Sequence, residues 1–142
     1  MVIVAAISGS EGTSDVAARG DELAQAFDDE LHLVHVIEES EYTRLVEKQS
    51  STRETDTGSV EDNAAAAAAD GLDEVITSDY SVVGRVGNPG KKVVEYVNEV
   101  DARYLVVGGR ARSPVGKALF GSVTQSILLN AERPVVTVTS PE

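Results

Sequence analysis

The sequence predicts a parallel α/β fold in which five strands alternate with four helices. Short runs rich in β-branched residues alternate with segments of helical period, which is the pattern of a parallel sheet covered by helices. The chain opens with the continuous apolar run Val2–Ile7, as expected for a strand buried on both faces. Its 142 residues, 42% of them hydrophobic, suit a single domain over residues 1–142 with one core.

The part of the chain up to residue 58 supplies two strands and one helix. We expect strands at Val2–Ile7 and Leu31–Ile37, and a helix between them for which Thr13 or Ser14 offers the N-cap. Residues 38–58 are polar and charged and show no sustained period. We therefore expect that stretch to be a long loop or a poorly ordered segment that can begin the next helix.

Alanine, glycine and proline mark the elements in the middle of the chain. Six consecutive alanines, Ala64–Ala69, predict a helix within Ser59–Asp70, because alanine has the highest helix propensity. A short third strand is expected within Tyr80–Val86, where Gly84 interrupts the apolar run. The segment Gly87-Asn88-Pro89 marks the next helix, with asparagine as its N-cap and proline at its first position.

The last part of the chain predicts strand, loop, helix and strand in turn. A fourth strand is expected at Arg103–Val107, ending at Gly108-Gly109, where a glycine-rich loop begins. The next helix is expected from about Gly121 to Asn130, and the final strand at Pro134–Val138. The residues of that helix expected to face inward are Val123, Ile127 and Leu128.

The composition narrows the class of function. The formal net charge is −12 and only four lysines stand against 24 acidic residues, so nucleic-acid binding is not expected. A lysine-poor acidic surface suits a protein that stays soluble in concentrated salt, which gives the hypothesis of a halophilic source. An ordinary acidic protein is the alternative, and net charge alone does not separate the two.

We also expect no signal peptide, no membrane-spanning segment and no cysteine chemistry. No apolar run is long enough to span a bilayer, and the opening MVIVAAIS lacks the basic region of a signal peptide. We therefore expect a cytoplasmic protein. With no cysteine in the chain, a disulfide framework and thiolate catalysis are excluded.

The charge is unevenly distributed along the chain. Residues 1–90 hold 19 acidic and five basic side chains, whereas residues 91–142 hold five acidic and seven basic ones. Within Gly108–Ser122 three basic residues, Arg110, Arg112 and Lys117, occur without any acidic residue. A basic, glycine-rich stretch in so acidic a chain suggests a place for an anion.

The same stretch combines the parts of a phosphate site. Glycine lets the backbone approach phosphate oxygens, and free amides at a helix N-terminus donate to them. Ser122 would add a hydroxyl, and Arg110, Arg112 or Lys117 would screen the charge. A glycine-bearing loop that leads into a capped helix explains these residues equally well, so both interpretations stay open at this point.

The spacing Gly108-x2-Ala111-x9-Gly121-Ser122 resembles the universal stress protein pattern Gly-x2-Gly-x9-Gly-Ser/Thr. Several spaced motifs in the right order are more specific than one glycine pattern, and only residues 38–75 lack a clear counterpart. Four further segments are similar to the family's opening strand and turn, its second strand, the start of its third helix and its last strand, in this order: Ile3–Glu11, Leu31–Ile37, Gly87–Pro89 and Arg133–Val138.

This resemblance implies a Rossmann-like or flavodoxin-like αβα sandwich with the strand order 3-2-1-4-5. It also implies a homodimer paired through the last strand, here Pro134–Val138, and ATP or another adenine nucleotide, with magnesium, across the carboxyl ends of strands one and four. Carried over by position, Ile7 and Ser8 lie near the adenosine, the Val36 backbone near the adenine, and Gly108, Ala111, Gly121, Ser122 and the Val123 amide around the phosphates.

Two of these positions depart from the family pattern. Ser8 stands where nucleotide-binding members have an aspartate, and Ala111 replaces the second glycine of the loop. We expect a binding or signalling module, in which nucleotide would order the loop Gly109–Phe120 and alter a partner surface. The alternatives are a nucleotide-free dimerisation module and a slow ATP hydrolase.

Other catalytic or metal chemistry is not expected. His32 and His35 belong to one predicted strand at a spacing that places them on opposite faces, so they cannot share a metal ion. No serine has a credible base beside it for nucleophilic catalysis. No carboxylate in the C-terminal loop is placed to hold a metal for hydrolysis.

Overall fold

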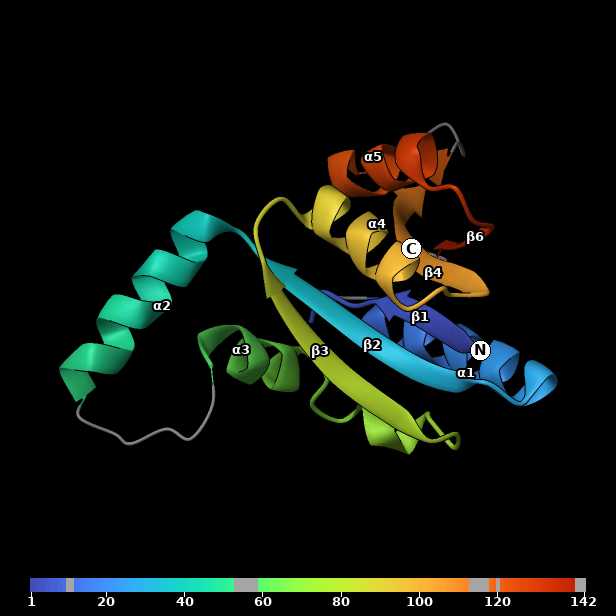
Figure 1. The fold of residues 1–142 in the computed structure, drawn as a ribbon, viewed down its shortest axis with the longest axis horizontal. Helices are drawn as coiled ribbons and strands as arrows, with labels where there is room; N and C mark the ends of the chain where they lie inside the picture. The colour runs from blue at the N-terminus through green and yellow to red at the C-terminus, as the bar shows by residue number, and fades with distance from the viewer. Residues whose placement is uncertain (10–11, 53–58, 113–117, 120, 140–142) are drawn as a thin grey trace.

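The computed structural model describes residues 1–9, 12–52, 59–112, 118–119 and 121–139, and its side chains at 49–52, 110–112 and 118–119 lie outside the description. A parallel sheet forms the middle layer, with α1 (Thr13–Phe27) and α3 (Val60–Ala68) on one face and α4 (Pro89–Glu99) and α5 (Ser122–Asn130) on the other (Figure 1). This three-layer arrangement confirms the predicted αβα sandwich. The remaining elements are β1 (Val2–Ala6), β2 (Glu30–Ile37), α2 (Glu39–Thr52), the 3-10 turn η1 (Leu72–Glu74), β3 (Tyr80–Val86), β4 (Tyr104–Arg112), β5 (Ala118–Leu119) and β6 (Val135–Thr139).

The strand order confirms the prediction. The parallel sheet runs β3-β2-β1-β4-β6, which is 3-2-1-4-5 when the five predicted strands are counted in chain order. A sixth, two-residue strand, β5, pairs antiparallel with the far end of β4. The direction of the order reverses between β1 and β4, so the carboxyl ends of these two neighbours flank the switch point of the fold.

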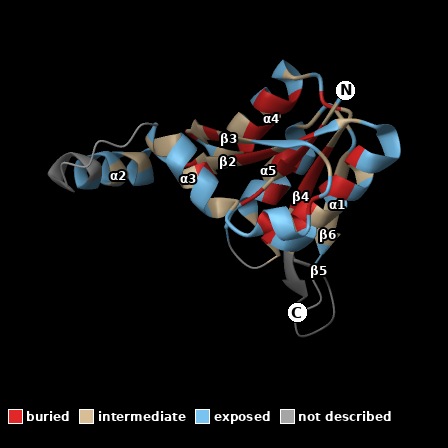
Figure 2. Ribbon diagram, turned by 90° about the horizontal axis from the view of Figure 1, so that it is seen from below, coloured by how far each residue is buried: buried red, intermediate tan, exposed pale blue. Residues whose placement is uncertain are grey.

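The core lies on both faces of the sheet because successive strand residues point to opposite sides. On β1, Ile3 and Ala5 pack with α1 and the η1 turn, whereas Val4 packs with α4 and α5. The buried residues of both clusters are aliphatic, with the exception of Tyr96 in the cluster under α4 and α5. Figure 2 shows these buried residues concentrated in the strands and in the inner sides of the helices.

The helix caps follow local chemistry, with one departure from expectation. Asn88 caps α4 by accepting a hydrogen bond from the Lys91 amide at 3.0 Å, with Pro89 at the first helical position, as predicted. Ser59 caps α3 in the same way. Neither Thr13 nor Ser14 caps α1, because the N-cap is Gly12 with φ 89°, a left-handed conformation that glycine adopts without steric cost.

The prediction that residues 38–58 form a loop or poorly ordered segment is wrong over most of its length. Residues Glu39–Thr52 form α2, which raises the number of α-helices in the described residues to five, and residues 53–58 lie outside the description. Figure 1 shows α2 projecting away from the sandwich. No residue of its described part is buried (Figure 2). The helical period was weak in the sequence because the helix has no sheet to cover.

Glycine does not interrupt strands β3 and β4 as expected. Strand β3 spans all seven residues Tyr80–Val86 and includes Gly84. The residue there is a glycine because a side chain would collide with the backbone of Glu61, which lies against the strand. Strand β4 continues through Gly108-Gly109 to Arg112 instead of ending at Val107. Gly108 and Gly109, expected to begin the glycine-rich loop, are therefore strand residues. Strand β5 pairs further along β4, at Arg110 and Arg112.

Helix α5 faces the core through fewer residues than predicted. Ile127 is 1% exposed and lies in the cluster with α4, as expected. Val123 and Leu128, also expected to face inward, are 40% and 41% exposed, and Thr124 is buried instead. A polar residue takes the inward position because its hydroxyl finds a backbone partner on β4.

Candidate functional site

The turn after β1 forms the first part of the candidate site. Ile7 is buried and its amide donates to the Val34 carbonyl at 2.9 Å, so the chain stays beside β2 for one residue beyond the strand. Ser8 then becomes exposed, with its hydroxyl 3.4 Å from that of Thr13. Gly9, with φ 77°, turns the chain against Ala68 of α3. The turn is thus held on three sides by neighbouring elements.

His35 fixes this turn from β2. Its Nδ1 lies 2.9 Å from the carbonyl oxygen of Ile7. Because a carbonyl only accepts, Nδ1 carries the proton, and Nε2 is an acceptor in the neutral ring. Sequence reasoning tested His35 only as a metal ligand. No motif in the sequence signals its contact with the turn after β1.

The strand β4 brings the first glycine of the pattern to the same edge of the sheet. Ala5 of β1 and Val106 of β4 are partners in register. Ile7 and Gly108 each lie two residues further along from these partners. A side chain at Gly108 would meet Val16 of α1 at 3.2 Å. Close packing against α1 therefore supplies a structural reason for this glycine beside any role with phosphate.

Thr124 connects β4 with the start of α5. Its hydroxyl donates to the Gly108 carbonyl at 2.9 Å, and the side chain is buried. This contact holds the first turn of α5 over the Gly108-Gly109 segment of β4. Sequence reasoning missed Thr124, because a threonine in the first turn of a helix is ordinary and its partner lies 16 residues earlier.

The N-terminus of α5 presents backbone donors without a side-chain cap. Its N-cap is Gly121 in an extended conformation, a residue without a side chain to accept from the first-turn amides. The amides of Ser122 and Val123 belong to the first turn, where helical backbone donors have no partner within the helix. Such amides, together with the helix dipole, favour an anion.

The predicted site residues thus gather at one edge of the sheet. Ile7 and Ser8 follow β1, Val36 lies near the end of β2, and Gly108 lies on β4. Gly121, Ser122 and Val123 open α5. The backbones of Arg110, Ala111 and Arg112 belong to β4 and their side chains lie outside the described residues, as does Lys117 entirely.

The two histidines do not form a metal site. His32 Nδ1 lies 2.6 Å from the hydroxyl of Tyr96 on α4, whereas His35 contacts the turn after β1, so they point to opposite faces as predicted. Within the described ranges no group of three or more histidine, aspartate or glutamate side chains is arranged to hold a metal ion.

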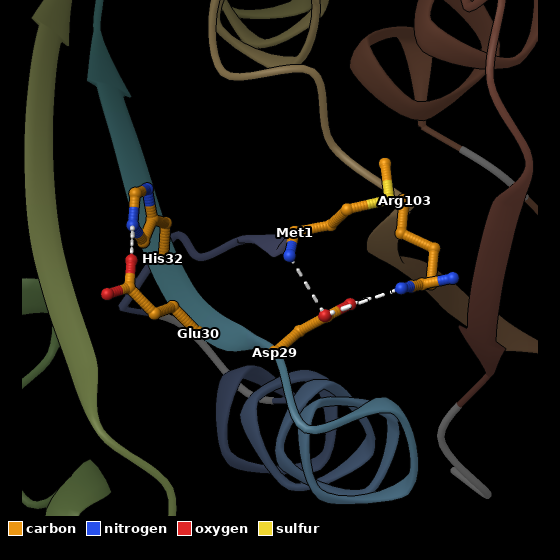
Figure 3. A network of polar contacts seen from close by, with 5 residues as sticks. All are labelled: Met1, Asp29, Glu30, His32 and Arg103. Atoms are coloured by element: carbon orange, nitrogen blue, oxygen red, sulfur yellow. Dashed lines mark hydrogen bonds and ion pairs between the residues drawn. The ribbon is translucent and has the colours of Figure 1, made fainter.

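A buried ionic network lies at the other end of the strands (Figure 3). The Asp29 carboxylate, 2% exposed, contacts the Arg103 guanidinium at 2.7 Å and the Met1 amino group at 3.1 Å. The hydrogen bond from Arg103 lowers the pKa of Asp29, and the amino group adds to this effect against the cost of burial. This network joins the starts of β1, β2 and β4 and lies away from the candidate site.

Comparison with known proteins identifies the family. The model of the universal stress protein family matches residues 1–139. The chain therefore belongs to the universal stress protein family. A curated universal stress protein from Mycolicibacterium smegmatis is 44% identical over 48 residues, which cover 34% of this chain and 37% of that relative. The aligned region thus spans only about a third of the curated relative's length.

Solved structures share the fold. A universal stress protein from Archaeoglobus fulgidus has a TM-score of 0.69 at 24% identity, covering 96% of this chain and 97% of its own. The Archaeoglobus fulgidus protein in complex with dAMP gives 0.61 at 20% identity, with 96% of each chain covered. A universal stress protein in complex with cAMP gives 0.63 at 20% identity, with 98% and 96% covered.

The described helices also bear on membrane association. None of them has the length and apolar character that crossing a bilayer requires.

Proposed function

We propose that this universal stress protein binds an adenine nucleotide at the carboxyl ends of β1 and β4, as a binding module rather than as an enzyme. The observation that carries the proposal is the convergence of the β1 turn, the Gly108-Gly109 segment of β4 and the glycine-capped start of α5 at the switch point of the sheet. Ligands of open α/β sheets bind at this position.

The residues present fit such a ligand in two respects. The amides of Ser122 and Val123 suit a phosphate, because they belong to the uncapped first turn of α5. The exposed Ser8 offers a hydroxyl at the end of β1, where a nucleoside would lie. The dAMP and cAMP complexes of similar folds support a ligand with a single phosphate, which one helix N-terminus can hold.

The departures from the family pattern determine the affinity that we expect for the nucleotide. Ser8 lacks the charge and the length of the family's aspartate. It therefore binds the ribose more weakly than the aspartate does in members that have it. Arg110, Arg112 and Lys117 add positive charge to this part of the chain, which favours the phosphate. We therefore propose modest affinity, with the phosphate contributing more than the ribose.

Calorimetric titration tests the proposal. AMP, cAMP and ATP are added to the protein in molar potassium chloride, with and without magnesium. We expect heat of binding with a stoichiometry of about one nucleotide per chain and no phosphate release from ATP above background. Absence of binding for all three ligands would favour the nucleotide-free module, and sustained phosphate release would favour the hydrolase.

The substitution Ser8→Asp sharpens this experiment. A carboxylate accepts hydrogen bonds from ribose hydroxyls more strongly than a serine does, by about 1.5 kcal/mol or roughly tenfold in affinity. We expect Ser8→Asp to tighten AMP binding more than dAMP binding, because dAMP lacks the 2′-hydroxyl. The control is Asn98→Ala, an exposed position near the far end of α4. Equal effects on AMP and dAMP would remove Ser8 from the ribose site.

We also propose that the protein is a homodimer paired through β6. In the described sheet β6 is an edge strand, bonded on one side to β4, and an edge strand offers unpaired backbone groups to a second copy. The other edge, β3, is adjacent in sequence to residues 59–79, which contain six acidic and no basic side chains. Like charges oppose pairing of two copies there.

A further inference from the structure

Helix α2 lies outside the sandwich and buries none of its described side chains. Figure 1 shows it projecting from the sheet, and neither core cluster of the described residues includes one of its side chains. The helix spans 14 residues, six of them serine, threonine or valine, which form helices less readily than alanine. A single helix of this length is marginal in water unless one of its sides packs against another surface. A covering surface is therefore needed to stabilise α2.

The large apolar side chains of α2 lie on one side of the helix. Tyr42, Leu45 and Val46 follow the spacing i, i+3 and i+4, which places them on neighbouring positions of one face. Tyr42 and Leu45 are half-buried, and Val46 is 38% exposed. The group covers little more than one turn, so it is shorter than the stripe of a helix packed on a sheet. It matches one heptad of a two-helix pair, with Tyr42 and Leu45 at the two core positions.

Two opposite charges flank this apolar group on the same side. Glu41 and Lys48 are seven residues apart, so they occupy the same flank, one before the group and one after it. Within the helix Glu41 contacts Arg44 at 3.9 Å, an exposed pair of the kind that contributes little to stability. A flank that is acidic at one end and basic at the other complements the same flank of a second copy that runs in the opposite direction.

We infer that α2 pairs antiparallel with α2 of a second copy of this chain. A two-fold axis across the middle of the helix seats Tyr42 of each copy against the partner's Leu45. The same register sets Glu41 beside the partner's Lys48 twice, once at each end of the interface, so two ion pairs form together. A parallel pair would instead place Glu41 beside the partner's Val46 and leave the two charges unmatched.

The charge of the chain restricts which surfaces of two copies can meet. The net charge is −12, so most faces of two copies repel each other. Residues 39–52 hold three acidic and two basic side chains, and the antiparallel register brings opposite charges together. The inference depends neither on pairing through β6 nor on nucleotide binding.

The size of the contact determines its strength. Two helices of 14 residues, each about 21 Å long, bury less than the roughly 1,200–2,000 Å² of a stable protein interface. We therefore expect weak association that depends on protein concentration. Through α2 alone it yields a dimer, and it yields larger assemblies if β6 pairs as well.

Sedimentation equilibrium over a concentration series tests the pairing in about 0.15 M potassium chloride, where a Debye length of about 8 Å leaves adjacent charges effective. We expect Leu45→Gln to weaken self-association by at least about tenfold, because each substitution counts twice about a two-fold axis. The control is Val75→Gln, an apolar residue beside η1 that is 38% exposed, as Val46 is, and it should leave the association unchanged. Circular dichroism should show both variants folded, since neither side chain is buried.

Charge reversal tests the antiparallel register. Glu41→Lys sets lysine beside lysine at both ends of the interface, and Lys48→Glu sets glutamate beside glutamate. Each variant alone should therefore associate about fivefold more weakly. The double variant Glu41→Lys/Lys48→Glu, and an equimolar mixture of the two single variants, should regain the association of the wild type, because opposite charges meet again.

The outcomes separate pairing through α2 from pairing through β6. An association step that is lost in Leu45→Gln while a dimer remains would support the inference, with the remaining dimer held by another surface. Self-association that Leu45→Gln leaves unchanged would overturn it, and so would a wild-type protein that is monomeric at every concentration. Charge reversals that neither the double variant nor the mixture rescues would contradict the antiparallel register.

Discussion

At the scale of single residues, Asp21 shows how hydrogen bonds stabilise a buried charge. Its carboxylate is 4% exposed and accepts from the amides of Thr77 and Ser78 at 3.1 and 2.9 Å. The other oxygen accepts from Gln25 at 2.7 Å and from the Thr77 hydroxyl at 3.1 Å. Asp21 thereby holds the loop that leads into β3, through backbone partners that lie 56 and 57 residues later in the chain.

These contacts predict an acid-dependent contribution to stability. Burial raises the pKa of Asp21, but hydrogen bonds from Ser78, Thr77 and Gln25 outweigh it and leave the pKa below its ordinary value. A lowered pKa in the folded state stabilises the protein above the unfolded-state pKa of about 3.9, and this contribution is lost as the pH falls through the folded-state pKa. Protonation therefore weakens the fold in acid.

We expect Asp21→Asn to reduce the free energy of unfolding by about 1–3 kcal/mol at pH 7, because asparagine offers one acceptor oxygen where two are used. The difference from wild type should shrink below about pH 4. Urea unfolding at pH 7, 5 and 3 measures it, with Asp73→Asn, an exposed residue of η1, as control. A difference that stays constant from pH 7 to pH 3 would show that the ionised carboxylate is not the stabilising species.

At the scale of elements, the sequence predicted the strands of the sheet and the start of α4. It did not predict the helix without a buried face or the contacts between residues distant in sequence. The parallel strands and the cap at Asn88 were predictable, because apolar runs and a proline-bearing helix start are local signals. Helix α2 was not, since a helix without a buried face shows no apolar stripe. The contacts of Thr124 and His35 were not predictable either, because their backbone partners are distant in sequence.

Gly84 illustrates such a tertiary constraint and gives a prediction for α3. A side chain at this position would overlap the carbonyl oxygen of Glu61, a backbone atom at the start of α3 that cannot rotate away. We expect Gly84→Ala to destabilise the protein by about 1–3 kcal/mol or more. Thermal and urea unfolding measure this, with the exposed Ser81→Ala on the same strand as control. Equal stability of the two variants would contradict the close contact between α3 and β3.

At the scale of the whole molecule, charge is distributed unevenly between two regions. Residues 1–90 carry the acidic excess, whereas α5 and β6 are nearly uncharged. The candidate nucleotide site lies where these two regions meet, at β1 and β4. The site's glycines and helix start could be predicted from the sequence by resemblance to the family. The proximity of the β1 turn to Gly108 depends on strand register, which only the fold supplies.

The acidic excess predicts stability that rises with salt. Screening reduces repulsion between surface charges, since the Debye length falls from about 10 Å at 0.1 M to about 3 Å at 1 M. We expect the free energy of unfolding to increase from dilute to molar potassium chloride. The double variant Asp73→Lys/Glu74→Lys, which raises the net charge by four, should depend less on salt. Equal stability in dilute and molar salt would contradict the hypothesis of a halophilic source.

The location of the bound nucleotide tests the central proposal most directly. Amide chemical shifts of the isotope-labelled protein are followed by NMR during titration with AMP. We predict shifts at Ile7, Ser8 and Val36 and at the start of α5, with none at Asp29 or Arg103 at the other end of the strands. Unchanged spectra at saturating AMP, or shifts confined to the Asp29 end of the sheet, would contradict nucleotide binding at the carboxyl ends of β1 and β4.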